Sequence, residues 1–486
     1  MKERMFLLPL LFLSSSLTNC ALTDHYALTS DAAGGTAGAV ALAGGTSAGA
    51  QGGEGSSIIV LGAGAGGVAG GTVAQAGSAG SPLTAVCSLP CTELEACCAG
   101  TCAEITTNAQ HCGSCGNVCD AGRKCAASAC QKGWVDMAPP PTGFVGRIHA
   151  ASVAMGSSVF IWGGRDSGGV ALDTGAIYSP IADSWVLVNQ SGAPTARTLA
   201  TAVWTGSVVI VFGGIDAAGN NLLKDAYSYD PDAKTWTTLP PALTPRSQAL
   251  GIWDGKRAIF WGGTSPTNVA IAGADRFDLT NWTTSSGPGD PGALLAPATA
   301  FDGSILYLLG GILNGTRQEK AFTYETTSDK WSTMSKGPTM RSSPFGVWDG
   351  ARFVVWGGRD DANVRNDGKY LAGSTWTAMN ATGAPSARMD FWRRTGWAFA
   401  PRPGVVAIVG GQTSLTGNGT FSTNGATFDT AANSWKAIAD WPSGETHDYG
   451  AGVWTGEEFV LWSGYDQVAA AGQAGNATIT GERLAF

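Results

Sequence analysis

The sequence predicts an all-β protein whose main part is a seven-bladed β-propeller, and two repeated features support this fold class. Glycine pairs follow short apolar runs at intervals of 47 to 53 residues, a period that suits four-stranded propeller blades rather than helical repeats. A tryptophan follows six of these pairs after 19 to 25 residues. The pairs are Gly163-Gly164, Gly213-Gly214, Gly262-Gly263, Gly310-Gly311, Gly357-Gly358 and Gly410-Gly411, with a degenerate seventh at Ser463-Gly464.

The elements of each repeat are predicted in a fixed order. A first strand ends in an aromatic residue such as Trp253, and a hairpin turn such as Asp254-Gly255 follows it. The second strand is apolar throughout, which is typical of a strand buried on both faces, and the glycine pair then allows a sharp bend. These second strands are predicted at 159–162, 208–212, 258–261, 305–309, 353–356, 405–409 and 459–462. A third strand carries an aromatic residue (Tyr178, Tyr229, Phe277, Phe322, Tyr370 or Phe428), and a fourth carries the tryptophan (Trp185, Trp236, Trp282, Trp331, Trp376 or Trp435).

The number of tryptophans predicts how the ring closes. After Ser463-Gly464 only about twenty residues remain, and none of them is a tryptophan. Upstream, Trp134 stands in a strand-like stretch with no glycine pair before it. We therefore expect the strand at Trp134 to complete the seventh blade, which would pair the two ends of the propeller and leave no open edge between first and last blades.

This pattern resembles the kelch repeat family over residues 133–486. The resemblance implies a kelch-type β-propeller, which is usually a binding platform and sometimes an enzyme, as in galactose oxidase and the sialic-acid epimerases. The sequence departs from the family pattern at Ser463 and before the fourth blade, where residues 293–298 lack the arginine seen elsewhere.

The first third of the chain is predicted to be a leader and a tether. Residues 1–19 combine Lys2 and Arg4 with a short apolar stretch, which indicates a secretory signal. The following Cys20 closes a Leu-x-x-Cys ending that resembles the lipobox of bacterial lipoproteins, so the resemblance implies an acylated Cys20; the alternative is simple secretion with Cys20 removed. Residues 20–81 are predicted to be a Gly/Ala-rich flexible tether. The G-x-G-x-x-G match within it at Gly62 lacks the helix and acidic residue of a dinucleotide site and is rejected.

Ten of the eleven cysteines lie within residues 82–132, which we predict to be a disulfide-rich module too small to fold on its core alone. They are Cys87, Cys91, Cys97, Cys98, Cys102, Cys112, Cys115, Cys119, Cys125 and Cys130, and the spacing leaves their pairing open. The run from Cys97 to Cys119 resembles the stigma-specific protein family. A zinc site at His111, Cys112 and Cys115 is the alternative, with an oxidising compartment against it.

A binding site is predicted at one end of the propeller channel. In a meander of four strands, the loop after the second strand and the segment entering the next blade lie on the same side of the ring. Charged residues gather in both: Arg147, Arg165, Arg197, Asp216, Arg246, Arg341, Arg359, Asp360, Arg388 and His447. The arginines suit recognition of carboxylates; the alternative is that one arginine per blade fastens adjacent loops.

These observations favour a binding protein over an enzyme. Copper chemistry is excluded because the propeller has no cysteine and only His149 and His447, and no recognisable acid and base pair indicates a hydrolase or epimerase. No basic cluster indicates a nucleic-acid partner. We expect an exported, monomeric protein without a cofactor, attached to the outer membrane or cell surface by lipid, or secreted, that binds a protein or a glycan. The alternative is a carbohydrate-active enzyme of the sialic-acid epimerase-like type.

Overall fold

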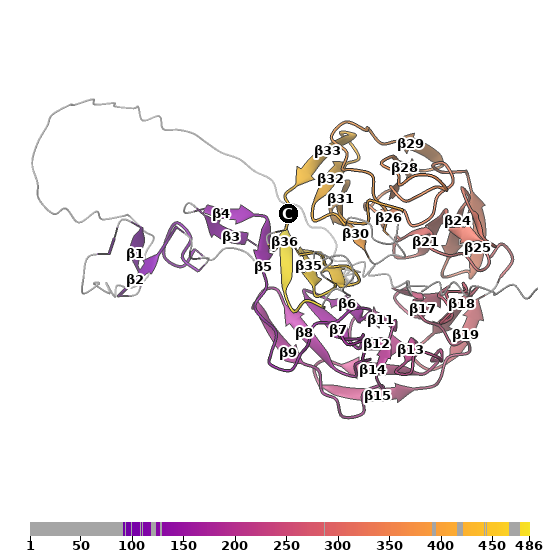
Figure 1. Cartoon of the computed structure of the whole chain (residues 1–486), viewed down its shortest axis with the longest axis horizontal. Coiled ribbons are helices and arrows are strands. Elements are labelled where there is room, and N and C mark those ends of the chain that lie inside the picture. The colour runs from indigo at the N-terminus through magenta and orange to yellow at the C-terminus, as the bar shows by residue number, and fades with distance from the viewer. Residues whose placement is uncertain are drawn as a thin grey trace, which may run out of the picture.

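The computed structural model describes residues 91–486 except 93, 99, 107, 109, 118–122, 127–128, 286, 391–394, 416–420, 442, 444 and 466–476. The predicted leader, the tether, Cys20 and Cys87 lie outside these residues. Every regular element among the described residues is a β-strand, and seven four-stranded sheets stand radially around a central axis (Figure 1). The predicted seven-bladed all-β propeller is therefore confirmed. No helix in the described part has the length and apolar character needed to cross a membrane.

Each blade is an antiparallel meander whose first strand lies next to the axis and whose fourth lies at the rim. The strands of blade 1 are β6 (Ala151–Met155), β7 (Ser158–Trp162), β8 (Gly175–Ser179) and β9 (Ser184–Leu187); those of blade 2 are β11 (Thr201–Trp204), β12 (Val209–Phe212), β14 (Ala226–Asp230) and β15 (Thr235–Leu239). Blade 3 has β16 (Leu250–Trp253), β17 (Ala258–Trp261), β18 (Ala274–Phe277) and β19 (Trp282–Ser285); blade 4 has β20 (Ala298–Phe301), β21 (Ile305–Leu309), β24 (Ala321–Glu325) and β25 (Lys330–Met334). Blade 5 has β26 (Phe345–Trp348), β27 (Phe353–Trp356), β28 (Gly368–Ala372) and β29 (Thr375–Ala378); blade 6 has β30 (Gly396–Arg402), β31 (Val405–Gly410), β32 (Gly425–Asp429) and β33 (Ser434–Ile438).

The seventh blade joins the two ends of the propeller. Its strands are β34 (Ala451–Trp454), β35 (Glu458–Trp462), β36 (Gly481–Ala485) and, from the N-terminal side, β5 (Trp134–Asp136). β36 and β5 pair antiparallel with Leu484 opposite Trp134, so the predicted closure is confirmed. The ring thus has no open edge between its first and last blades.

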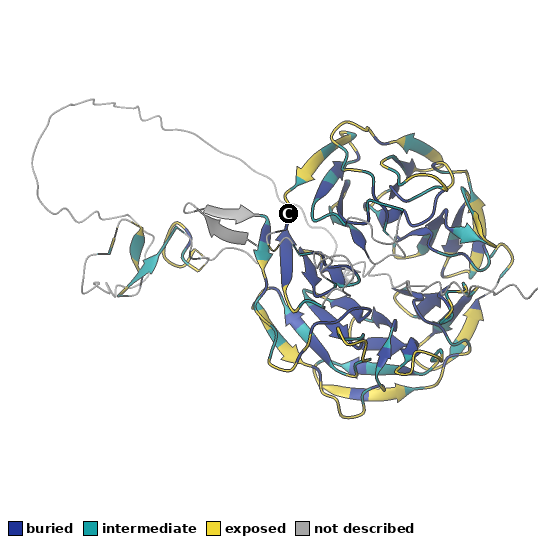
Figure 2. Ribbon diagram, in the orientation of Figure 1, coloured by how far each residue is buried: buried dark blue, intermediate teal, exposed yellow. Residues whose placement is uncertain are grey.

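The core lies between neighbouring blades. The second strand of each blade is almost fully buried, as in Val159, Phe160 and Ile161 of β7, and the exposed residues lie on the outer strands and loops (Figure 2). Six of the seven repeat tryptophans donate an indole N–H to a backbone carbonyl of the preceding blade at 2.7 to 3.2 Å. Two of these six, Trp134 and Trp185, make the bonds on either side of the closing blade. The tryptophans therefore fasten each rim strand to its neighbour while their rings fill the space between sheets.

The third strands carry the aromatic residues that the sequence predicts, including Phe322 in β24 and Tyr370 in β28. The residue opposite the tryptophan is nevertheless a different one in two blades, Tyr324 in blade 4 and Leu371 in blade 5. The segments between the glycine pairs and the third strands differ in length among the blades, so counting from the glycines does not determine the register of the third strand.

The cysteine-rich module precedes β5 with two short hairpins, β1 (Glu95–Cys98) with β2 (Thr101–Glu104) and β3 (Arg123–Ala126) with β4 (Ala129–Lys132). Disulfides join Cys91 to Cys102 and Cys98 to Cys115, and Cys97 and Cys112 are also disulfide-bonded. The zinc alternative at His111, Cys112 and Cys115 is wrong, because both of its sulfur atoms are already in disulfides and offer no thiolate.

Candidate functional site: the channel mouth

The glycine pairs lie where the chain of one blade meets the segment that enters the next. Both glycines of Gly213-Gly214 have positive φ values of 65° and 99°, and a Cβ on Gly213 would lie 2.3 Å from the carbonyl oxygen of Arg246. The neighbouring N–H of Gly214 donates to that same carbonyl at 2.8 Å. Glycine is thus required by both the backbone conformation and the close approach.

The two kinds of loop lie on the same side of the ring, as predicted. The residue after each glycine pair forms a β-bridge with the segment before the first strand of its own blade, as Arg165 does with Ile148 and Arg359 with Ser342. The short strands β10 (Arg197–Thr198) and β13 (Ile215–Asp216) repeat this pairing in blade 2, and β22 (Ile312–Leu313) with β23 (Thr316–Arg317) forms a loop hairpin in blade 4. We call this side of the ring the mouth face.

Five of the predicted site residues are buried inside these loops. We call Arg147, Arg197, Arg246, Arg341 and Arg388 the clasp arginines. Each donates from Nη1 to the carbonyl of the first glycine of its own blade, at 2.7 to 3.2 Å. Each also reaches the loop that follows that glycine pair. The clasp arginines therefore fasten loops, which was the alternative that the sequence left open, and a ligand on the surface of the mouth face does not reach them.

The clasp arginines differ in which groups compensate the positive charge of the guanidinium. Arg197 contacts both carboxylate oxygens of Asp225 at 2.7 Å, and Arg246 contacts Asp275 at 2.7 Å with both side chains buried. Among the described residues, Arg147 has only carbonyl and hydroxyl groups as hydrogen-bond partners, and its guanidinium lies 3.9 Å from the ring centre of Phe144. Burial lowers the pKa of Arg147 to about 9 and that of Arg388 to about 10, so both stay cationic at neutral pH.

Blades 4 and 7 lack the arginine. Leu294 takes the place in blade 4, and its side chain lies beside Gly311, where an added Cβ would be 3.0 Å from it. In blade 7, His447 Nδ1 lies 2.8 Å from the carbonyl oxygen of Ser463, which is the bond the arginines make elsewhere, and its Nε2 lies 2.8 Å from Glu482 Oε2. Burial lowers the pKa of His447, but the hydrogen bond and the charge of Glu482 raise it more, and the net shift is upward. His447 is therefore a clasp residue as well.

A ring of residues at the channel opening was missed by sequence reasoning. Six of them, each two positions after a clasp position, have left-handed backbone with φ between 50° and 63° although none is glycine: His149, Leu199, Gln248, Ala296, Ser343 and Tyr449. The N–H groups of four of them, His149, Leu199, Gln248 and Ser343, donate to the carbonyl of the equivalent residue in the preceding blade. This ring makes the mouth a rigid frame, at a cost of about 1 to 3 kcal/mol per strained residue. The spacing from the arginine was the one available signal.

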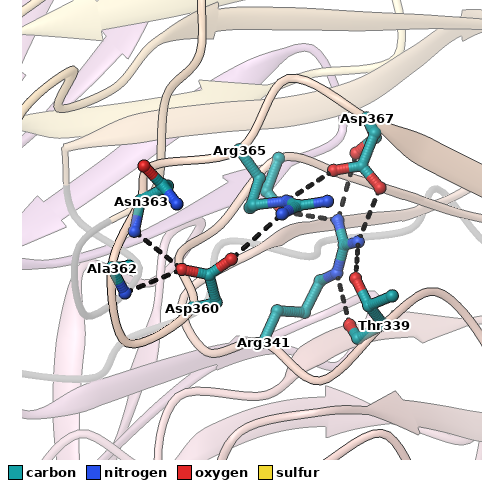
Figure 3. A network of polar contacts seen from close by, with 8 residues as sticks. Thr339, Arg341, Asp360, Ala362, Asn363, Arg365 and Asp367 are labelled. Carbon is teal, nitrogen blue, oxygen red and sulfur yellow. Dashed lines mark hydrogen bonds and ion pairs between the residues drawn. The ribbon is translucent and has the colours of Figure 1, made fainter.

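The remaining predicted residues lie nearer the surface. In blade 5, Asp360 and Asp367 both accept from Arg365, at 3.0 and 2.9 Å, and Asp367 also accepts from Arg341 at 2.8 Å (Figure 3). Desolvation raises the pKa of Asp360, but hydrogen bonds from the N–H groups of Ala362 and Asn363 and from Arg365 lower it more, so the net shift is downward. Asp360 is therefore held ionised as part of its own loop.

Arg165 and Asp216 line one shallow hollow between blades 1 and 2. The hollow measures about 70 Å³ and is also lined by His149, Thr198 and Leu199. A pocket for a drug-sized ligand measures about 300 to 1,000 Å³, so this one admits only the tip of a side chain. No cluster of metal-binding side chains occurs in the described part of the chain.

Exposed apolar side chains also occur on the mouth face. The described propeller has ten large hydrophobic residues that are exposed, and six lie in mouth-face loops: Val145, Val170, Leu243, Val269, Met340 and Ile479. Two others, Ile181 and Leu279, lie in turns on the opposite face, and Val186 and Leu187 lie on the rim strand β9. We call the six residues in the mouth-face loops the apolar mouth residues. A protein interface combines apolar side chains at its centre with polar and charged ones around them.

Comparisons with known proteins agree with the architecture. A family model described as the KLHDC2/KLHL20/DRC7 Kelch-repeats domain matches residues 148–336, and one described as the stigma-specific STIG1-like protein family matches residues 81–133. The comparisons support a kelch-type family for the propeller and a STIG1-like module before it.

Relatives among characterised proteins match only part of their length. Kelch-like protein 25 of Xenopus tropicalis is 24% identical over 220 residues, which cover 44% of this chain and 37% of the relative. Beta-scruin of Limulus polyphemus is 27% identical over 124 residues, covering 24% and 13%. A solved structure titled "Structure of YjhT" has 16% identity and a TM-score of 0.47, and the match covers 62% of this chain and 99% of that one. The chain thus spans little more than a third of the first relative.

Proposed function

We propose that this chain is a protein-binding platform whose mouth face holds the partner. The observation that carries the proposal is that two sets of side chains on that face differ in exposure. The clasp arginines are buried and bind the loops of the fold, whereas the apolar mouth residues and the surface charges are exposed to solvent. A rigid frame under an exposed apolar and charged surface lowers the entropy lost on binding. The kelch-type relatives support the same function. Nothing in the described residues favours the carbohydrate-active alternative.

The proposal includes export and a lipid anchor at Cys20. The charged and apolar pattern of residues 1–19 and the disulfides of the cysteine-rich module support an oxidising location outside the cytoplasm. Metabolic labelling with a fatty-acid analogue is expected to label the wild type and not Cys20→Ser. An unlabelled wild type would exclude the anchor and leave secretion.

Site-specific photo-crosslinking tests the platform. Blade 3 offers a matched pair of exposed positions on opposite faces, Val269 on the mouth face and Leu279 on the other, which are 62% and 49% exposed. A benzoylphenylalanine at each position, in the full chain expressed in its source cells, is irradiated and the adducts are identified by mass spectrometry. We expect a discrete protein adduct from position 269 and none from position 279. Equal adduct patterns from both positions would contradict the proposal.

A glycan array run on the same protein separates the two ligand classes. Glycan capture that is lost in Val269→Asp, with no protein adduct at position 269, would make the mouth face a glycan site. Leu279→Asp is the matched control, because it places the same charge in the same blade on the opposite face.

A further inference from the structure

Two arginines on the mouth face stand apart from the clasp arginines. Arg165 and Arg359 are the first residues after the glycine pairs of blades 1 and 5, and the Nε of each is buried. Neither Nε has an acceptor among the described residues. A buried donor without a partner costs about 1 to 3 kcal/mol, so it calls for a ligand or a water to accept from it.

Only Arg165 combines this donor with a measured hollow. In the part of the chain that the structure describes, its guanidinium makes no hydrogen bond or ion pair, while every clasp arginine makes at least three. Arg359, in contrast, stands beside Arg317, which is paired with Asp361. The surroundings of Arg165 therefore offer an unused cation at a site that a partner can enter.

The size and the lining residues of the hollow determine which chemical groups it can accept. Its volume of about 70 Å³ is small, but it is enough for a carboxyl group. Thr198 offers a hydroxyl group at its wall. The carboxylate of Asp216 also lines the hollow, but it accepts from Asn220 N, Asn221 N and Asn221 Nδ2 at 2.6 to 3.2 Å and is held by its own loop. The negative charge of Asp216 at the edge of the hollow repels a doubly charged phosphate more strongly than a singly charged carboxylate.

We infer that the hollow between blades 1 and 2 is an anchor site for an acidic side chain of the protein partner, with the Arg165 guanidinium as its counter-charge. The inference rests on the proposed function and names the chemistry that the partner brings to the mouth face. A planar guanidinium pairs with a carboxylate through two parallel hydrogen bonds, and the partial burial of Arg165 makes that pair stronger than one in open water.

The test uses two isosteric probes, N-acetylglutamate methylamide and N-acetylglutamine methylamide, titrated onto the full chain at physiological salt and followed by saturation-transfer NMR. We expect the glutamate probe to bind with a millimolar Kd and the glutamine probe to bind at least tenfold more weakly. Arg165→Gln is expected to weaken the glutamate probe at least tenfold, and Arg165→Lys less. Arg359→Gln is the matched control and is expected to leave binding unchanged.

Several outcomes would overturn the inference: no saturable binding of the glutamate probe, equal binding of both probes, or equal binding to Arg165→Gln. Because Arg165 has no fold partner among the described residues, Arg165→Gln is expected to keep the wild-type melting temperature, so a loss of binding reports on the site. A partner adduct at position 269 without binding of the glutamate probe would retain the platform and remove this anchor site alone.

Discussion

Hydrogen bonds join neighbouring blades at the junction of blades 2 and 3 and at the junction of blades 7 and 1, but different chemical groups make them. At the first, Gly214 N–H donates to the Arg246 carbonyl at 2.8 Å, and the Arg246 side chain holds Gly262 and Asp275. At the second, the N–H of Arg147 donates to Ser463 Oγ at 2.7 Å, and that hydroxyl lies 2.9 Å from the Arg147 carbonyl. A side chain thus replaces a backbone group where the two ends of the chain meet. The comparison shows that the repeat conserves the contact, while the residue that makes it can change.

Removing the arginine at the junction of blades 2 and 3 is expected to have the largest effect. Arg246→Ala leaves Asp275, which is fully buried, without its counter-charge, and this costs about 3 to 5 kcal/mol in the free energy of unfolding. Urea unfolding measures it. Lys336→Ala breaks an exposed pair with Glu319 and is expected to change stability by less than about 0.5 kcal/mol. A loss below about 1 kcal/mol in Arg246→Ala would show that the clasp does not hold the junction.

The sequence was sufficient for the number of blades and for the closure through Trp134, because glycine pairs and tryptophans report on backbone geometry and packing directly. It was insufficient for the role of the arginines, because a guanidinium that binds a ligand and one that binds backbone carbonyls have the same residue type and spacing. The residues with left-handed backbone at the channel opening could not be recognised from their residue types, because His149, Leu199 and Ala296 share a positive φ but have different side-chain chemistry. Arg165 could be distinguished from Arg197 only by the partners that each contacts.

Substituting a glycine at the junction of blades 2 and 3 is expected to cost somewhat less. Gly213→Ala combines an unfavourable φ of 65° with a Cβ that would lie 2.3 Å from the Arg246 carbonyl oxygen, so we expect a loss of about 2 to 4 kcal/mol. Gly373→Ala is the matched control, because Gly373 has a φ of 62° and open space around the added Cβ. It should lose only the strain, about 1 kcal/mol. Equal losses in thermal or urea unfolding would mean that the close approach contributes nothing.

The serine at the junction of blades 7 and 1 gives a smaller and more discriminating effect. Ser463→Ala keeps the strained φ of 58° and removes the acceptor of the Arg147 N–H, so a loss of about 1 to 3 kcal/mol is expected. Ser463→Gly removes the same hydroxyl but relieves the strain, and it should be more stable than Ser463→Ala by about 1 kcal/mol. If both variants unfold at the same urea concentration, the hydroxyl alone determines this junction; if neither differs from wild type, the hydroxyl has no role there.

The smallest effect is expected from the histidine clasp, and it depends on pH. The pKa of buried His447 is raised by Glu482, with Glu445 adding to the shift, so the folded state holds its proton more tightly than the unfolded chain does. Its stabilising contribution is therefore fully present below the unfolded pKa of about 6.5 and is lost as pH rises through the higher folded pKa. The difference in the free energy of unfolding between wild type and His447→Gln should therefore shrink from pH 6 to pH 9. Taking this difference cancels the titration of Glu458 in the same blade, whose pKa burial also raises. A difference that stays constant or grows with pH would show that His447 is held as a neutral ring, and that the closing blade uses no ion pair in place of the arginine.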